Sequence, residues 1–173
     1  MKLRSPTHSM LALLSLAALA CSDGPSAPGE KEGTGTLTAS GAVTASGSGV
    51  ALFQSISSGG TSLFQILVAP ATQTTNTWEL QIANYTGRLA VGTYQLSPLS
   101  PSSPDPTAAF YYVSGGNMDM YNSTSGQLVI TSSSPSAVKG TFTFTATRTA
   151  GGAGTVTAQG SFNAKCAPGF ACQ

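Results

Sequence analysis

From residue 36 onward, apolar and polar residues alternate with a period of two, in segments bounded by Gly, Pro, Asn and Ser. Such alternation is typical of β-strands with one buried and one hydrated face. We find no extended stretch with a helical period in this region. The segments that read as strands are residues 36–44, 49–57, 62–69, 77–84, 92–96, 108–114, 117–121, 126–132, 138–149 and 155–164.

The clearest hairpin is predicted near the end of the chain. Residues 138–149 and 155–164 each place apolar side chains on one face and Thr, Ser, Gln or Asn on the other, with a Gly-rich turn between them. Thr is β-branched, so it favours a strand while keeping the outer face hydrated. Many short strands separated by turns predict an all-β protein: a single antiparallel β-sandwich of about 8–10 strands, with a β-barrel as second choice and no substantial helix outside an N-terminal signal peptide.

The first residues of the chain indicate export. Lys2 and Arg4 precede an unbroken apolar segment at residues 10–20, which is shorter than the roughly 20 residues that a bilayer span requires. A positive start followed by a short apolar segment is the pattern of an export signal.

Residues 18–21 read Ala-Leu-Ala-Cys and are followed by Ser-Asp-Gly-Pro, which breaks any helix. This arrangement resembles the lipobox of bacterial lipoproteins, although the commonest pattern has Leu where this chain has Ala18. The resemblance implies that Cys21 carries a thioether-linked diacylglycerol and, after cleavage, an acyl group such as palmitate on its amino group. Ser22 resembles the residue that sorts such proteins to the outer membrane. The alternative is an ordinary secretory signal cut after Ala20, which leaves Cys21 unmodified.

These patterns divide the chain into three parts. Residues 1–20 are the predicted lipoprotein signal peptide, and residues 21–35 are the acylated Cys and a flexible linker rich in Ser, Pro and Gly. The linker contains no large apolar residue, and a coil of this length reaches on the order of 20 Å. Residues 36–173 are the predicted β-sandwich domain.

Cys166 and Cys172 enclose five residues that include a Pro-Gly turn. In an oxidising compartment we expect a disulfide between them, with two free thiols as the alternative. Closing so short a loop adds only about 2 kcal/mol to the free energy of unfolding, so the main role of the bond would be to fix the position of the C-terminal end of the domain. The spacing matches neither paired zinc ligands nor a redox-active cysteine pair.

Charged residues are scarce, which excludes several functions. The chain of 173 residues has seven Lys or Arg, six Asp or Glu, 46 Ser or Thr and a net charge of +1, so it has no electrostatic footprint for nucleic acid. The only His is His8, in the signal segment, so the mature domain has no His to serve as a base in acid–base or triad chemistry. Asp105 with Asp119 or Glu79 is the one conceivable carboxylate pair, and we interpret these residues as solvated surface.

Metal binding is not expected either. Asn117, Asp119 and Asn122 lie near Gly115 and Gly116, but one carboxylate gives little charge and the spacing matches no standard calcium loop. Asn and Asp in this position are interpreted as turn residues. The sequence therefore predicts a protein that is not an enzyme and has no cofactor or metal.

Aromatic residues are the better lead to a binding site. Tyr111 and Tyr112 are adjacent, and because successive strand residues face opposite sides, one of them is expected outside the core. An exposed Tyr beside Asn on a neutral surface suits a glycan or a protein contact; the alternative is a Tyr that covers a sheet edge. The candidate contact residues are Tyr111, Tyr112, Tyr121, Asn117 and Asn122.

Five segments of the chain occur in an order that resembles a family of small bacterial lipoproteins of uncharacterised function. They are GTYQL at 92–96, the aromatic segment at 110–112, GQLVIT at 126–131, VKGTFTFTA at 138–146 and VTAQGSF at 156–162. The resemblance implies a lipid-anchored all-β domain and supplies no catalytic residues.

We therefore predict a non-catalytic lipoprotein of the bacterial cell envelope, most simply of the outer membrane, that presents a binding or structural module on a tether. Its expected partners are the membrane, through the lipid anchor, and a glycan or an envelope protein, but not nucleic acid. The alternative is a carbohydrate-binding or weakly glycan-hydrolysing exported domain.

Overall fold

The computed structural model describes residues 33–58, 60–72, 74–100, 102–149, 153–170 and 172. The chain divides into two units, Met1–Glu30 and Lys31–Gln173, and every strand and every buried core residue belongs to the second. The predicted signal peptide, the predicted lipid attachment at Cys21 and most of the predicted linker lie outside the described residues.

Alternating residues form nine strands, and no helix occurs in the described ranges. No helix long and apolar enough to cross a bilayer is found there either. The all-β prediction is confirmed. The strands are β1 (Thr34–Gly41), β2 (Ala45–Ser58), β3 (Thr61–Pro70), β4 (Asn76–Asn84), β5 (Gly92–Gln95), β6 (Thr107–Ser114), β7 (Asn117–Ser133), β8 (Ala137–Arg148) and β9 (Thr155–Cys166).

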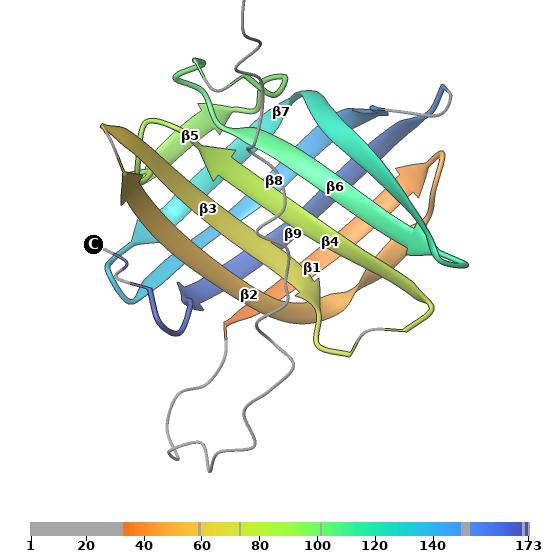
Figure 1. The fold of residues 1–173 in the computed structure, drawn as a ribbon, viewed down its shortest axis with the longest axis horizontal. Helices are drawn as coiled ribbons and strands as arrows, with labels where there is room; N and C mark the ends of the chain where they lie inside the picture. Colours follow the sequence, from red (N-terminus) through yellow and green to blue (C-terminus); the bar gives the residue numbers. More distant parts are fainter. Residues whose placement is uncertain are drawn as a thin grey trace, which may run out of the picture. The chain divides into compact units, whose positions relative to one another are not determined.

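The strands close into an eight-stranded antiparallel barrel (Figure 1). Neighbours around the ring are β1, β2, β3, β4, β6, β7, β8 and β9, and β9 pairs again with β1, from Thr34↔Asn163 to Gly41↔Val156. The predicted sandwich is therefore wrong, and the second choice, a barrel, is the observed fold. Period-two alternation is the same in both architectures, and it is the pairing of the first strand with the last that separates them.

Strand β5 fills a break in the barrel wall. It pairs with β7 at residues 127–130, whereas β6 pairs with the same side of β7 at residues 117–122, so β5 and β6 share one strand position. Ser123 of β7 connects the two segments at this position. Its buried hydroxyl accepts a hydrogen bond from the Ala108 N–H at 2.9 Å, in β6, and donates one to the Ser97 carbonyl at 2.7 Å, just after β5. The pairing of β7 with β8 shifts register at this point, which explains why residues 117–121 and 126–132 were predicted as separate strands.

The barrel is filled by side chains rather than hollow along its length. The apolar residues of every wall strand form one buried cluster. Two large aromatic side chains each have a Gly as cross-strand partner, which leaves room for the ring in the barrel interior: Phe142 pairs with Gly160, and Phe162 pairs with Gly140. A Cβ on Gly160 would overlap the Thr36 carbonyl oxygen and lie 2.6 Å from Phe142 Cζ.

One end of the barrel, called the closed end below, is covered by side chains. The Arg88 guanidinium lies 5.4 Å from the centroid of the Phe53 ring and donates to the Cys172 carbonyl at 3.3 Å. Cys172 is disulfide-bonded to Cys166, with the two Cα atoms 5.8 Å apart, so the predicted disulfide is confirmed. The opposite end, called the mouth end, carries the β1–β2, β3–β4, β6–β7 and β8–β9 connections.

Candidate functional site

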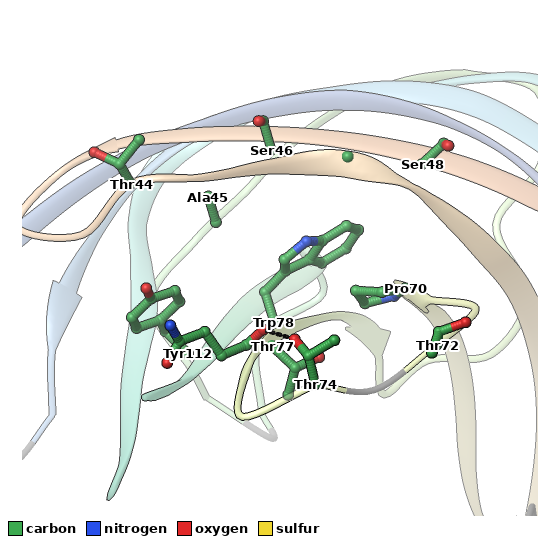
Figure 2. A pocket seen from close by; sticks show the side chains of 12 residues that line it. Thr44, Ala45, Ser46, Ser48, Pro70, Thr72, Thr74, Thr77, Trp78 and Tyr112 are labelled. Atoms are coloured by element: carbon green, nitrogen blue, oxygen red, sulfur yellow. Dashed lines mark hydrogen bonds between the residues drawn. The ribbon is translucent and has the colours of Figure 1, made fainter. Parts of the chain in front are cut away.

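A pocket of about 360 Å³ opens at the mouth end of the barrel (Figure 2). It lies between the first residues of β2, the β3–β4 connection, the start of β4 and the end of β6. None of the described residues that line it has a charged side chain. Its volume lies at the lower end of the range usual for small-ligand sites, about 300–1,000 Å³.

The pocket exists because β3 ends before its neighbours do. The last residue of β3, Pro70, pairs with Gly49, so the four residues Ala45–Ser48 of β2 extend beyond it with β1 on one side only. On the other side, the last pair between β3 and β4 is Val68↔Leu80. Pro has no N–H to donate, so it cannot extend a ladder inside a sheet.

Trp78 forms the floor of this opening. The alternation of β4 directs Trp78, Leu80 and Ile82 into the barrel, and the indole is 6% exposed. A Cβ on Gly47 would lie 3.8 Å from both Trp78 Cζ2 and Trp78 Nε1, so Gly47 leaves β2 open above the ring. Within the described residues the Nε1–H makes no hydrogen bond. Trp78 is also the single Trp of the chain.

A tyrosine gives the pocket further hydrogen-bonding capacity. Tyr112 is the cross-strand partner of Trp78 and lines the same pocket. Thr77 also lines it, but it is next to Trp78 in β4, so its side chain lies on the opposite face of the strand, and its Oγ1 is buried and lacks a partner within the described part of the chain.

An ion pair lies beside Tyr112 at the mouth end. Asp119 is the cross-strand partner of Tyr112, and its carboxylate binds the Arg148 guanidinium. The two side chains are about a quarter exposed, 25% for Asp119 and 28% for Arg148. The Asp119 carboxylate, on the same face of the sheet as Tyr112, is therefore already paired with a cation.

The five residues predicted as ligand contacts do not form one cluster. Tyr112 lines the pocket, whereas Tyr111 faces outward on the barrel wall, as expected for adjacent strand residues. Tyr121 is 1% exposed and packs its ring 6.1 Å from Phe110, and burial raises the pKa of its phenol. Asn117 is exposed at the start of β7, and Asn122, on the same strand, is half-buried.

The three domain carboxylates are also separated. Glu79 is next to Trp78 in β4 and so faces the opposite side of the wall, where Gln81 Nε2 donates to it at 2.5 Å. Asp105 is exposed in the connection before β6, and Asp119 is bound by Arg148 as described. No group of three or more His, Cys, Asp or Glu suited to a metal ion occurs among the described residues.

Sequence reasoning missed Trp78 as a site residue. Its alternation with Leu80 and Ile82 predicts an inward side chain, which reads as ordinary core. The one signal of an opening was Pro70, which ends the predicted strand 62–69 six residues before β4 begins.

Comparisons with curated proteins and with solved structures found no match in either set. Residues 51–164 match the model of a family described as "Domain of unknown function (DUF6252)". The match runs from within β2 into β9 and includes Trp78 and Tyr112. The matched residues all lie in the barrel. The predicted lipid anchor at Cys21 is outside the match and stays a prediction. Since the match covers more than half of the chain, this protein belongs to the DUF6252 family.

Proposed function

We propose that this protein is a non-catalytic binding module of the bacterial cell envelope, lipid-anchored through Cys21, and that its ligand enters the pocket at the mouth end. The observation that carries the proposal is the pocket itself: an uncharged, concave site of about 360 Å³ over the indole of Trp78. Sites for small ligands typically combine an apolar lining with a few convergent polar groups.

The lining favours an uncharged ligand with both apolar surface and hydrogen-bonding groups. Trp78 and Pro70 offer apolar contact, while the Trp78 Nε1–H and the Tyr112 hydroxyl offer hydrogen bonds. A charged ligand would lose hydration here without gaining a counter-charge, because the lining has none. Neutral sugars have this chemistry, as do uncharged peptide segments.

The distribution of carboxylates supports a binding role over hydrolysis. Glycoside hydrolysis requires two carboxyl groups about 5–10 Å apart across the substrate. Glu79 faces outward from the wall, Asp119 is bound by Arg148 at the mouth end, and Asp105 is exposed in a separate connection. The alternative of a weak glycan hydrolase lacks an observation in its favour.

The envelope location rests on the sequence and on the disulfide. The Cys166–Cys172 bond suits an oxidising compartment outside the cytoplasm. The lipobox-like segment at residues 18–21 and Ser22 favour an acylated Cys21 and sorting to the outer membrane. The partners proposed on this basis are the membrane, through the anchor, and an envelope ligand in the pocket.

Intrinsic fluorescence tests the binding proposal, because all Trp emission comes from Trp78. The segment Lys31–Gln173, which contains every strand and core residue, is screened on an array of neutral glycans, and hits are titrated in solution. Adjacent tyrosines give a matched pair of variants. Tyr112→Phe should weaken binding about 3- to 10-fold by removing one hydrogen bond, whereas Tyr111→Phe should not change it. A ligand that leaves Trp78 emission unchanged, or that both variants weaken equally, would place the site elsewhere.

A further inference from the structure

We infer that the pocket accepts an extended peptide segment, which adds as a short β-strand along Ser46 and Ser48 of β2. This inference rests on the proposed function, because it uses the same pocket, and it names the class of ligand. The inference is based on Ser46 and Ser48, whose main-chain atoms, rather than their side chains, line the pocket.

The direction of the β2 main-chain groups follows from one hydrogen bond. The Ala51 N–H donates to the Gly33 carbonyl at 3.0 Å, on the side of β1. In an antiparallel strand, the N–H and C=O of successive residues point alternately to the two neighbouring strands. The main-chain groups of Gly49, Gly47 and Ala45 therefore also face β1, and those of Val50, Ser48 and Ser46 face the position of β3.

Of these three residues, only Val50 has main-chain hydrogen-bonding partners in β3. Val50 pairs with Ala69, and the last pair of the ladder is Gly49↔Pro70. Beyond it, Ser48 and Ser46 have no β3 partner, and no main-chain hydrogen bond to a turn or loop replaces it within the described residues. The barrel, which otherwise pairs its strands in a closed ring, thus leaves a short strand edge free at its mouth.

This edge faces the pocket. Ser46 and Ser48 both line it, yet Figure 2 shows their side chains pointing away from Trp78, on the outer side of β2. The atoms they present to the pocket are therefore main-chain atoms. Two N–H groups and two C=O groups are available, spaced by two residues, or about 7 Å along the strand.

Strand β4, on the other side of the opening, also has main-chain groups that face the gap. By the alternation described above, the β3 residue Val68 bonds with Leu80 of β4, so the main chain of Trp78, two residues earlier, also faces the space beyond β3. An extended segment placed in line with β3 lies between two strand edges. Its side chains would contact the Trp78 ring and Pro70 on the inner face.

These features favour a peptide over a sugar. Strand addition uses main-chain hydrogen bonds for affinity and a side-chain pocket for specificity, and both are present. The spacing of the free groups matches the repeat of a peptide main chain, whereas a sugar ring has no donors and acceptors in that pattern. The lining has no charge, so the occupying residues are expected to be uncharged.

The test is a random-heptapeptide display library panned on Lys31–Gln173, followed by titration of the selected peptides against Trp78 fluorescence. Ser48→Pro removes the N–H that faces the pocket and breaks no ladder bond with β3, because that ladder ends at Gly49↔Pro70. Ser48→Ala is the matched control, since it removes only an outward hydroxyl. Peptides should bind the original chain and Ser48→Ala equally and Ser48→Pro at least about 10-fold more weakly.

A second probe does not depend on the variant folding. Selected peptides are remade with N-methyl groups at alternate residues, which leaves the side chains intact and blocks main-chain donation. Affinity for the unchanged protein should fall about 10-fold or more in one of the two methylation registers and much less in the other.

Four outcomes are distinguished. Loss with Ser48→Pro and with one methylation register supports strand addition. Peptides that bind Ser48→Pro and both methylated forms as tightly as before overturn it. Neutral glycans that bind the pocket while no peptide is selected overturn the inference but leave the proposed function standing. Failure of both the glycan array and the peptide library overturns both.

Discussion

Glu79 is a carboxylate that the barrel wall partly buries although it points away from the core. Gln81 Nε2 donates to it, and this bond continues a row in which Gln54 donates to Gln65 at 2.8 Å and Gln65 to Gln81 at 2.9 Å. Burial raises the pKa of the Glu79 carboxyl, and the hydrogen bond from Gln81 opposes that rise only in part. Glu79 also raises the pKa of the neighbouring Tyr111 phenol, after the larger effect of that residue's own burial.

This raised pKa predicts how stability depends on pH. The folded state holds the Glu79 proton to a higher pH than the unfolded state does, so the free energy of unfolding falls as pH rises from below 4.5 through the raised pKa. Glu79→Gln should remove this fall and increase stability at neutral pH by less than about 1 kcal/mol, since solvent screens the group. Thermal melts from pH 3.5 to 8 measure the effect, expected at no more than about 4 °C.

The control for this prediction is an exposed carboxylate. Asp105→Asn removes the same charge from an exposed loop and so controls for the loss of one negative charge as such. A Glu79→Gln profile parallel to that of the original protein would contradict the assignment of the pH dependence to Glu79.

Strands were predictable from alternation because each wall strand buries one face. The predicted hairpin of residues 138–149 and 155–164 corresponds to β8 and β9, with Val138 opposite Ala164 and Phe142 opposite Gly160. Barrel closure was not predictable, because nothing in the alternation of residues 36–44 states which strand lies beside them. The pocket was missed for a related reason: it results from β3 ending at Pro70 while β2 continues, which is a property of pairing and not of one strand.

Strands β8 and β9 depend on Gly to accommodate large rings. Gly160→Ala should destabilise the barrel by about 1–3 kcal/mol, because the new methyl group would overlap the Thr36 carbonyl oxygen and lie 2.6 Å from Phe142 Cζ. The melting temperature should fall by about 3–10 °C. Gln159→Ala, at the exposed neighbouring position, should stay within about 0.5 kcal/mol of the original protein. Equal melting temperatures for the two variants would show that the interior has room to spare at this point.

The C-terminal loop after β9 is fixed by the disulfide at the closed end. Breaking it with Cys172→Ser should cost about 2 kcal/mol, or about 4–8 °C in melting temperature, because a short loop is released and the contact between Arg88 and the Cys172 carbonyl loosens. The same loss is expected for the original protein after reduction. If the reduced and oxidised forms have the same melting temperature, the disulfide does not stabilise the barrel.

At the scale of the whole molecule, the few charges are spread thinly over a neutral barrel. From residue 36 onward the chain has four basic and three acidic residues, Arg88, Lys139, Arg148, Lys165, Glu79, Asp105 and Asp119. The outward faces of β8, β9 and β1 consist mainly of Thr and other uncharged polar residues. Such a surface offers little long-range electrostatic attraction, so the binding that we propose at the mouth end would depend on short-range contacts and on the protein being held near its partner.

The proposed anchor at Cys21 would supply that proximity by holding the barrel on the membrane. Each buried methylene contributes about 0.8 kcal/mol, so two or three acyl chains hold a protein on a membrane without other apolar contacts. The full chain, expressed in a Gram-negative host, should therefore fractionate with membranes, and mass spectrometry should find a mature N-terminus at Cys21 bearing diacylglycerol and an N-acyl group. Cys21→Ser should prevent both modifications, and a chain cut after Ala20 should then be released in soluble form. A mature protein whose Cys21 has a free amine and a free thiol would instead be an ordinary secreted barrel, and its pocket would have to find its ligand by diffusion.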